Sequence, residues 1–216
     1  MMSVQRQAKS RVFLASMSAS LLLLAGTAGA ESILDEWATV KVPPAPPTKA
    51  VQLDPKTTAL LMLDFNQQTC NAQRRPRCIA SIPRVKTLLA AARAAHAPVV
   101  YSLGGGGKVT EIAADLAPAP GEPVVSSGVD KFRNTDLEKI LKDKGIATVV
   151  VVGAAANGAV LYTASTAAML GMKVVVPLDG ISADSAYPEQ FTAWQFANGP
   201  VISTSVTLTT IDGVKF

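Results

Sequence analysis

Short apolar segments alternate with longer amphipathic ones along most of the chain, and this alternation limits the possible folds more than any other feature. Strands are expected at residues 59–63, 99–102, 148–152 and 173–176, and helices at 82–96, 135–144, 159–170 and 187–197. A strand, helix, strand order needs crossover connections, which produce a parallel sheet. The central strands are apolar throughout, so helices are expected on both faces. The sequence therefore predicts an α/β fold, a three-layer α/β/α sandwich with a mainly parallel sheet.

Local signals refine these boundaries. Thr135 and Glu138 have the spacing of a capping box, which predicts that the helix at 135–144 begins at Thr135. Gly145 follows the cations of the last turn and is expected to end that helix. Residues 206–211 alternate between apolar and polar side chains, as an edge strand does.

The N-terminus has the features of a secretory signal. Arg6, Lys9 and Arg11 precede an apolar stretch at residues 12–25, and small residues at 28–30 form a cleavage site. We expect residues 1–30 to be removed and the protein to be periplasmic or secreted. The alternative is an uncleaved anchor, although the apolar run is shorter than the ~20 residues that span a membrane. No later run approaches that length, so no membrane association is expected after cleavage.

The charge of the chain gives no support to nucleic-acid binding. The formal charge is +4, and the predicted cleavage removes three cations and no anions, which leaves +1. Arg74, Arg75 and Arg77 form a local basic cluster. We expect a solvated loop there, with contact to a phosphate or a partner as the alternative.

The segment that follows the signal differs in composition from the rest of the chain. Residues 31–56 include proline pairs at 43–44 and 46–47. Up to residue 49 we expect an extended arm with neither helix nor ladder. Residues 57–216 are expected to form one domain.

Several familiar chemistries are excluded by residue counts and spacing. The chain has one histidine, His96, so a Ser-His-Asp triad or a site with two histidine ligands cannot form. We expect His96 to end a helix. The glycines at 104–107 precede Lys108 without Walker spacing, so a flexible loop lining a site is the better interpretation. No cofactor is expected.

The two cysteines, Cys70 and Cys78, lie in a segment expected to be a loop. In an exported protein such a pair is expected to form a disulfide. A reactive thiol or a metal ligand is the alternative for either residue.

Residues 153–160 join a predicted strand to a predicted helix, and open α/β sheets carry their chemistry at such junctions. The residue expected to project there is Ala159. Asp64 ends an earlier apolar strand, where a carboxylate is costly to bury without a cation. Lys131 is the candidate for that cation.

This order of Asp64, Lys131 and Ala159 resembles the isochorismatase-like hydrolases, the superfamily of nicotinamidases and related cysteine hydrolases, over residues 57–216. In most members the position of Ala159 holds the nucleophilic cysteine, the aspartate moves the proton and the lysine keeps the pair in register. The resemblance also implies a non-proline cis peptide at Ala154-Ala155 that forms an oxyanion hole. The same strand ends suggest further substrate contacts, at Asn157, Phe65 and Phe132, although both phenylalanines could equally be core residues.

Ala159 cannot attack a substrate, so the resemblance does not imply an acyl-enzyme route. True isochorismatases carry glycine there and hydrolyse a vinyl ether by protonation and water attack. We therefore expect Asp64 to act as acid and base on a small anionic molecule, breaking a C–O or C–N bond, with Lys131 stabilising the anion. The alternatives are a non-catalytic exported ligand-binding protein and a structural ion pair without function. Related hydrolases commonly form homo-oligomers, but nothing in the sequence fixes the number of subunits.

Overall fold

The computed structural model describes residues 32–216, and the predicted signal lies outside that range. Residues 44–216 form one compact unit, and the described residues before them, 32–43, form a separate part of the chain. That part contains α1 (Ile33–Glu36), a single turn in which Ser32 Oγ donates to Asp35 at 2.7 Å. The prediction that the arm holds no helix is wrong at this turn, because the prolines that prevent one begin only at Pro43.

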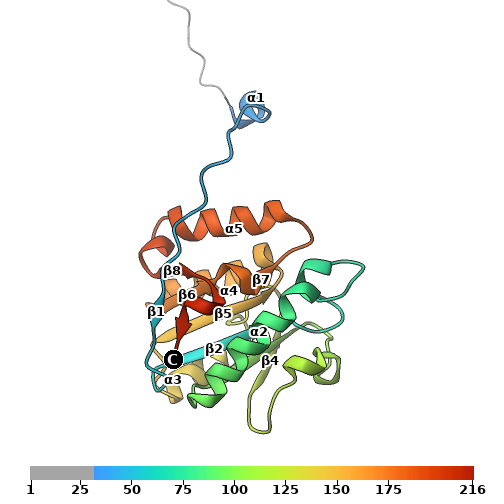
Figure 1. The fold of residues 1–216 in the computed structure, drawn as a ribbon, viewed down its shortest axis with the longest axis vertical. Coiled ribbons are helices and arrows are strands. Elements are labelled where there is room, and N and C mark those ends of the chain that lie inside the picture. Colours follow the sequence, from blue (N-terminus) through green and yellow to red (C-terminus); the bar gives the residue numbers. More distant parts are fainter. Residues whose placement is uncertain (1–31) are drawn as a thin grey trace, which may run out of the picture. The chain divides into compact units, whose positions relative to one another are not determined.

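The compact unit is built on a seven-stranded sheet in which every strand pairing is parallel. The strand order is β4-β3-β2-β5-β6-β8, and β7 pairs with the end of β5 (Figure 1). The strands are β2 (Thr58–Leu63), β3 (Val99–Gly104), β4 (Val124–Ser127), β5 (Thr148–Ala154), β6 (Lys173–Pro177), β7 (Ile181–Ser182) and β8 (Val206–Thr209). The parallel sheet and the edge position of β8 confirm the sequence predictions.

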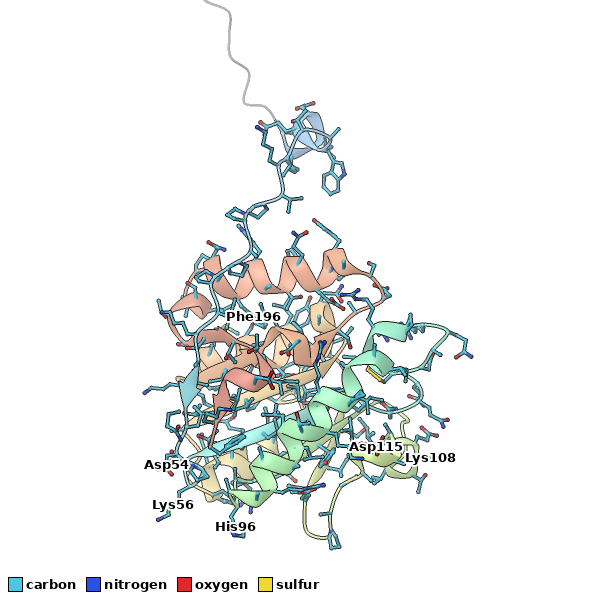
Figure 2. All side chains as sticks on the ribbon, viewed as in Figure 1. Asp54, Lys56, His96, Lys108, Asp115 and Phe196 are labelled. Atoms are coloured by element: carbon cyan, nitrogen blue, oxygen red, sulfur yellow. A yellow bond between two sulfur atoms is a disulfide. The ribbon has the colours of Figure 1, made fainter. Side chains whose placement is uncertain are left out.

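Helices cover both faces of this sheet. They are α2 (Pro76–Ala94), α3 (Leu137–Asp143), α4 (Leu161–Met169) and α5 (Ala186–Asn198). Alternate residues of β2 point to opposite faces. Leu60 and Met62 pack in the cluster that contains Leu88 of α2, whereas Leu61 packs with α3, α4 and Phe196 of α5, which points into this core (Figure 2). The result is the predicted three-layer α/β/α sandwich.

A second, two-stranded sheet joins the start of the unit to its end. β1 (Val51–Gln52) pairs in parallel with β9 (Val214–Lys215). The end of the proline-rich arm thus contributes a strand. Short 3-10 helices occupy the connections, at Val109–Glu111, Ala114–Leu116, Leu178–Gly180, Ile202–Thr204 and Ile211–Gly213. Within the described range, no helix is both long and apolar enough to cross a membrane.

α2 and α3 begin at other residues than predicted, each for a local reason. α2 begins at Pro76 rather than at residue 82, because proline is well tolerated in the first turn of a helix, where its missing N–H has no partner. α3 begins at Leu137, and the capping box predicted at Thr135 does not form. The Thr135 hydroxyl instead donates to the Lys131 carbonyl at 2.5 Å and accepts from the Leu137 N–H. Two other local hydrogen bonds of Thr135 therefore replace the predicted capping box.

The end of β5 approaches β2 closely at Gly153. Gly153 has φ 141°, and a Cβ added there would lie 2.1 Å from the carbonyl oxygen of Leu63, its partner in β2. We expect Gly153→Ala to lower the free energy of unfolding by about 3 kcal/mol or more, because both the backbone conformation and the contact oppose a side chain. Urea denaturation measures this change.

Gly171→Ala is the matched control. Gly171 also has a positive φ, 85°, but a Cβ there would meet no atom within 4 Å. Only the conformational cost remains, about 1 kcal/mol. Equal losses in the two variants would show that the close approach to Leu63 is unimportant.

Candidate functional site

The predicted pair of Asp64 and Lys131 meets at the carboxyl ends of the central strands. Asp64 follows β2 directly and has φ 54°, a left-handed conformation that few residue types other than glycine and the Asx residues adopt. Its Oδ2 accepts from Lys131 Nζ at 2.8 Å, and its Oδ1 accepts from the hydroxyl of Ser102 on β3 at 2.7 Å. Asp64 is 6% exposed and Lys131 is inaccessible to solvent. The ion pair is thus buried and also held by hydrogen bonds.

The ammonium of Lys131 is fully occupied by protein oxygens. Besides Asp64 it reaches the carbonyl oxygen of Gly128 at 2.7 Å and those of Leu103 and Ser127 at 3.4 Å. Three N–H donors thus face four acceptors. An anionic group of a ligand could bind Lys131 only by displacing one of these oxygens. The geometry suits a residue that fixes Asp64 better than one that binds a substrate anion.

The junction after β5 differs in detail from the sequence prediction. The peptide bond between Ala154 and Ala155 is cis, as the family resemblance implies. Residues Ala156–Val160 form a wide turn of π-helix before α4, and Gly158 has non-helical angles within it. α4 begins at Leu161, two residues after the predicted start, because Ala159 and Val160 still belong to the π-helical turn. Ala159 lies inside the turn and is 3% exposed.

The remaining predicted contacts lie in different surroundings. Asn157 is exposed on the turn after β5. Phe65 is 2% exposed and belongs to the core between the sheet and α2. Phe132 packs against the core on the other face and lines a pocket away from Asp64. A role for Asn157 and Phe65 in binding stays a prediction.

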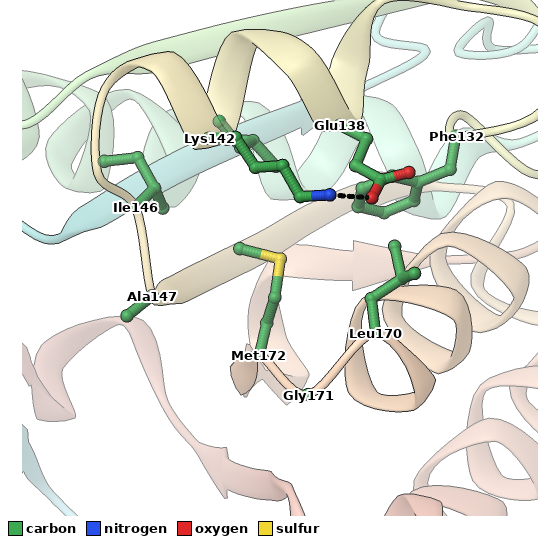
Figure 3. Close-up of a pocket in the computed structure, with 9 residues that line it drawn as sticks. Phe132, Glu138, Lys142, Ile146, Ala147, Leu170, Gly171 and Met172 are labelled. Atoms are coloured by element: carbon green, nitrogen blue, oxygen red, sulfur yellow. Dashed lines mark hydrogen bonds and ion pairs between the residues drawn. The ribbon is translucent and has the colours of Figure 1, made fainter.

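That pocket has a volume of about 310 Å³ and lies between α3 and the end of α4 (Figure 3). Ala147 and Met172, which line it, precede β5 and β6, so it opens at the amino ends of the strands. The ion pair of Glu138 and Lys142 borders it. Open parallel sheets bind their ligands at the carboxyl ends instead. This pocket is therefore separate from the candidate site.

Buried polar atoms without partners gather at the carboxyl edge. Among the described residues, the buried side-chain atoms that lack a hydrogen bond are Nδ2 and Oδ1 of Asn66, Nε of Arg75 and Oγ of Ser182. Asn66 follows Asp64 by two residues, Arg75 precedes α2, and Ser182 ends β7 opposite Ala154. Such atoms are rare in native proteins, because each loses its hydrogen bonds to water. Their position at the same edge of the sheet as the ion pair suggests a site for a polar ligand.

The sequence predicted none of these three residues as part of the site. Arg75 was expected in a solvated loop, but it is 8% exposed and Nη1 donates to the carbonyl oxygen of Thr69 at 3.0 Å. Burial lowers the pKa of Arg75, as does the charge of Arg74, while the carboxylates of Asp184 and Asp64 raise it. The position of Asn66 just beyond the end of a strand is the one sequence signal that could have identified it.

The glycine-rich loop also approaches this edge. A Cβ added at Gly107 would lie 2.8 Å from Nδ2 of Asn66. The loop therefore packs directly on one of the unpartnered side chains. A role for residues 104–107 in lining the site stays a prediction.

The structure confirms the predicted disulfide between Cys70 and Cys78. Cys78 lies in the first turn of α2 rather than in a loop, because the helix begins at Pro76. The closed ring includes Arg75 and holds the segment between Asp64 and α2 together.

Opening this ring should destabilise the protein. The chain-entropy estimate for so short a ring gives about 2–3 kcal/mol, so we expect urea denaturation to show a loss of that size after reduction. A variant with both Cys70→Ser and Cys78→Ser should have the lower stability with or without reductant. Equal stability of the oxidised and reduced wild-type protein would contradict this expectation.

No metal centre can be assigned within the described part of the chain. No group of three histidine, cysteine, aspartate or glutamate side chains comes together there. His96 lies on the surface just beyond α2, with φ 59° (Figure 2). Its position beyond the last turn agrees with the prediction that it ends a helix.

Comparison with known proteins places this arrangement in a family. Residues 58–206 match the isochorismatase domain. The chain belongs to the isochorismatase family of hydrolases. It is 31% identical over 148 residues to the secreted isochorismatase effector Isc1 of Verticillium dahliae. The aligned region covers 63% of this chain and 76% of that protein.

Solved structures of the isochorismatase family share the fold. A cysteine hydrolase from Pseudomonas syringae pv. phaseolicola superposes with a TM-score of 0.66 and 20% identity, over 77% of this chain and 94% of that chain. N-carbamoylsarcosine amidase from Thermoplasma acidophilum gives a TM-score of 0.63 and 21% identity, over 72% of this chain and 97% of that chain. At this level of identity the likeness concerns the fold alone.

Proposed function

We propose that this isochorismatase family member is an exported hydrolase that cleaves a small anionic molecule by acid-base catalysis at Asp64. The observation that carries the proposal is the set of unpartnered polar atoms on Asn66, Arg75 and Ser182 beside the buried pair of Asp64 and Lys131. A merely structural ion pair would not require unpaired donors and acceptors next to it. A bound polar molecule would supply the partners that these atoms lack.

The proposed chemistry follows from the residues at the junction. Ala159 has no nucleophilic atom and both cysteines are in a disulfide, so water is the nucleophile. For a vinyl ether, the pair of Asp64 and Lys131 donates a proton to the terminal carbon of the vinyl group. Water then adds to the carbon that bears the ether oxygen and returns a proton to the pair. The resulting hemiketal breaks into an alcohol and a carbonyl compound.

The test is turnover on a panel of carboxylate-bearing vinyl ethers, amides and esters, followed by product analysis. We expect hydrolysis of at least one class, and equal rates before and after treatment with iodoacetamide. Loss of activity on alkylation would contradict a mechanism without a thiol. Ligand-induced thermal shifts without any turnover would instead favour the non-catalytic binding function.

Export is the second part of the proposal. It is supported by the signal-like sequence at residues 1–30 and by the disulfide, which forms in oxidising compartments. The relative from Verticillium dahliae is named as a secreted protein. N-terminal sequencing of the protein recovered from cells should give Glu31. An intact Met1 would contradict cleavage.

A further inference from the structure

Arg75 is a buried cation without a counter-ion in the described part of the chain. It is 8% exposed, and its one hydrogen bond there joins Nη1 to the carbonyl oxygen of Thr69. Nε is buried without a partner, and Nη2 makes no hydrogen bond to any residue in 32–216. No carboxylate oxygen of these residues lies within 4.0 Å of its guanidinium nitrogens. Such burial is costly unless an anion compensates it.

Two other arginines of this protein use the same pair of nitrogens to bind a carboxylate. Arg77 reaches Glu189 with Nε at 2.7 Å and Nη2 at 2.5 Å. Arg93 reaches Glu122 with Nε at 2.9 Å and Nη2 at 2.7 Å. This parallel pair of bonds matches the two oxygens of a carboxylate in geometry and charge. Arg75 makes neither bond within the protein.

The position of Arg75 connects it with the proposed reaction. The disulfide ring holds it next to the segment that follows Asp64, and the charge of Asp64 acts on its guanidinium. Asn66 and Ser182 offer unpartnered polar atoms at the same edge of the sheet. Lys131 is less suited to bind the anion, because an anion would have to displace one of the protein oxygens that already occupy its ammonium.

We propose that Nε and Nη2 of Arg75 bind a carboxylate of the substrate side by side, and that Asn66 and Ser182 bind neighbouring polar atoms. Arg75 is then the residue that determines the specificity for anionic substrates. This inference rests on the proposed function in placing the ligand beside Asp64. It deepens that proposal by naming Arg75 as the residue that binds the carboxylate.

Matched pairs of charged and neutral probes test the inference without any turnover. Calorimetry would measure the binding of acrylate and benzoate, of acrylamide and benzamide, and of inorganic phosphate. We expect the full-length mature protein to bind a carboxylate more tightly than its amide. Arg75→Met removes two charge-assisted hydrogen bonds, so it should weaken carboxylate binding by about 100-fold or more and leave amide binding unchanged.

Arg74→Met is the control, because Arg74 is exposed in the same disulfide ring. It should leave all affinities unchanged. Arg75→Lys should restore only part of the carboxylate affinity, since lysine lacks the parallel donors. The melting temperature separates binding from structure, because replacing an unpaired buried charge by an apolar side chain should not lower it.

Three outcomes would overturn the inference. They are equal carboxylate binding in wild type and Arg75→Met, no carboxylate binding by the wild type, and tighter binding of phosphate than of any carboxylate. A large fall in the melting temperature of Arg75→Met, with unchanged preference for carboxylates, would assign Arg75 a structural role. Arg75-dependent carboxylate binding without hydrolysis of any substrate would keep the inference and refute the proposed hydrolase.

Discussion

Replacing Asp64 by asparagine is expected to lower kcat by about 10²- to 10⁴-fold, the usual contribution of a general acid or base. Asparagine has nearly the same shape and can still accept the hydrogen bond from Ser102 at Oδ1. It cannot give or take a proton at the pH of the assay. The substrate affinity should change much less than kcat, because Arg75, and not Asp64, is proposed to bind the substrate anion. Steady-state kinetics on the substrate found in the panel measure both quantities.

Asp130→Asn is the matched control for this experiment. Asp130 is in the loop next to Lys131, where its carboxylate accepts from the N–H of Phe132 at 3.0 Å and from Thr166 at 2.9 Å. The same chemical change there removes a charge near the site without touching the ion pair. We expect kcat to stay within a factor of about two or three, a change of well under 1 kcal/mol in activation free energy. If Asp64→Asn retains full activity, the catalytic site lies elsewhere.

The arrangement of the site could be predicted where the sequence forces a buried charge. Asp64 ends an apolar strand, and a carboxylate in that position needs a cation. The structure supplies Lys131, the residue that the sequence suggested, at 2.8 Å. The parallel sheet was predictable for a similar reason, since the β2 and β5 strands are apolar on both faces and must be covered by helices.

The residues proposed to bind the ligand were not predictable, because their burial depends on contacts that hydrophobic periodicity does not reveal. Arg75 lies in a basic run that looks solvated, yet the disulfide and the Thr69 carbonyl hold it inside. Ser182 is buried because β7 pairs with the end of β5. The disulfide was predicted, but the hydrogen bond of Arg75 to Thr69 and the pairing of β7 with β5 leave no periodic pattern in the sequence. The same holds for Thr135, whose hydroxyl is taken by the Lys131 carbonyl instead of capping α3.

Replacing Lys131 by methionine is expected to lower the free energy of unfolding by about 3–5 kcal/mol, the usual cost of removing one partner of a buried ion pair. Asp64 would keep only the hydrogen bond from Ser102 while it remains 6% exposed. The carbonyl oxygen of Gly128 would lose its 2.7 Å donor as well. Urea denaturation with the linear extrapolation measures the loss, provided that the transition stays cooperative.

A second charge removal should reverse part of this loss. In the double variant Asp64→Asn with Lys131→Met, neither charge of the ion pair is left without the other, so its stability loss should be smaller than the sum of the two single losses. Lys139→Met is the control, because Lys139 pairs with Asp143 on an exposed face of α3 and should contribute no measurable stability. Additive losses at Asp64 and Lys131 would mean that the two charges do not depend on each other. The lysine would then be held by the backbone carbonyls alone, and the claim that it fixes the catalytic carboxylate would be wrong.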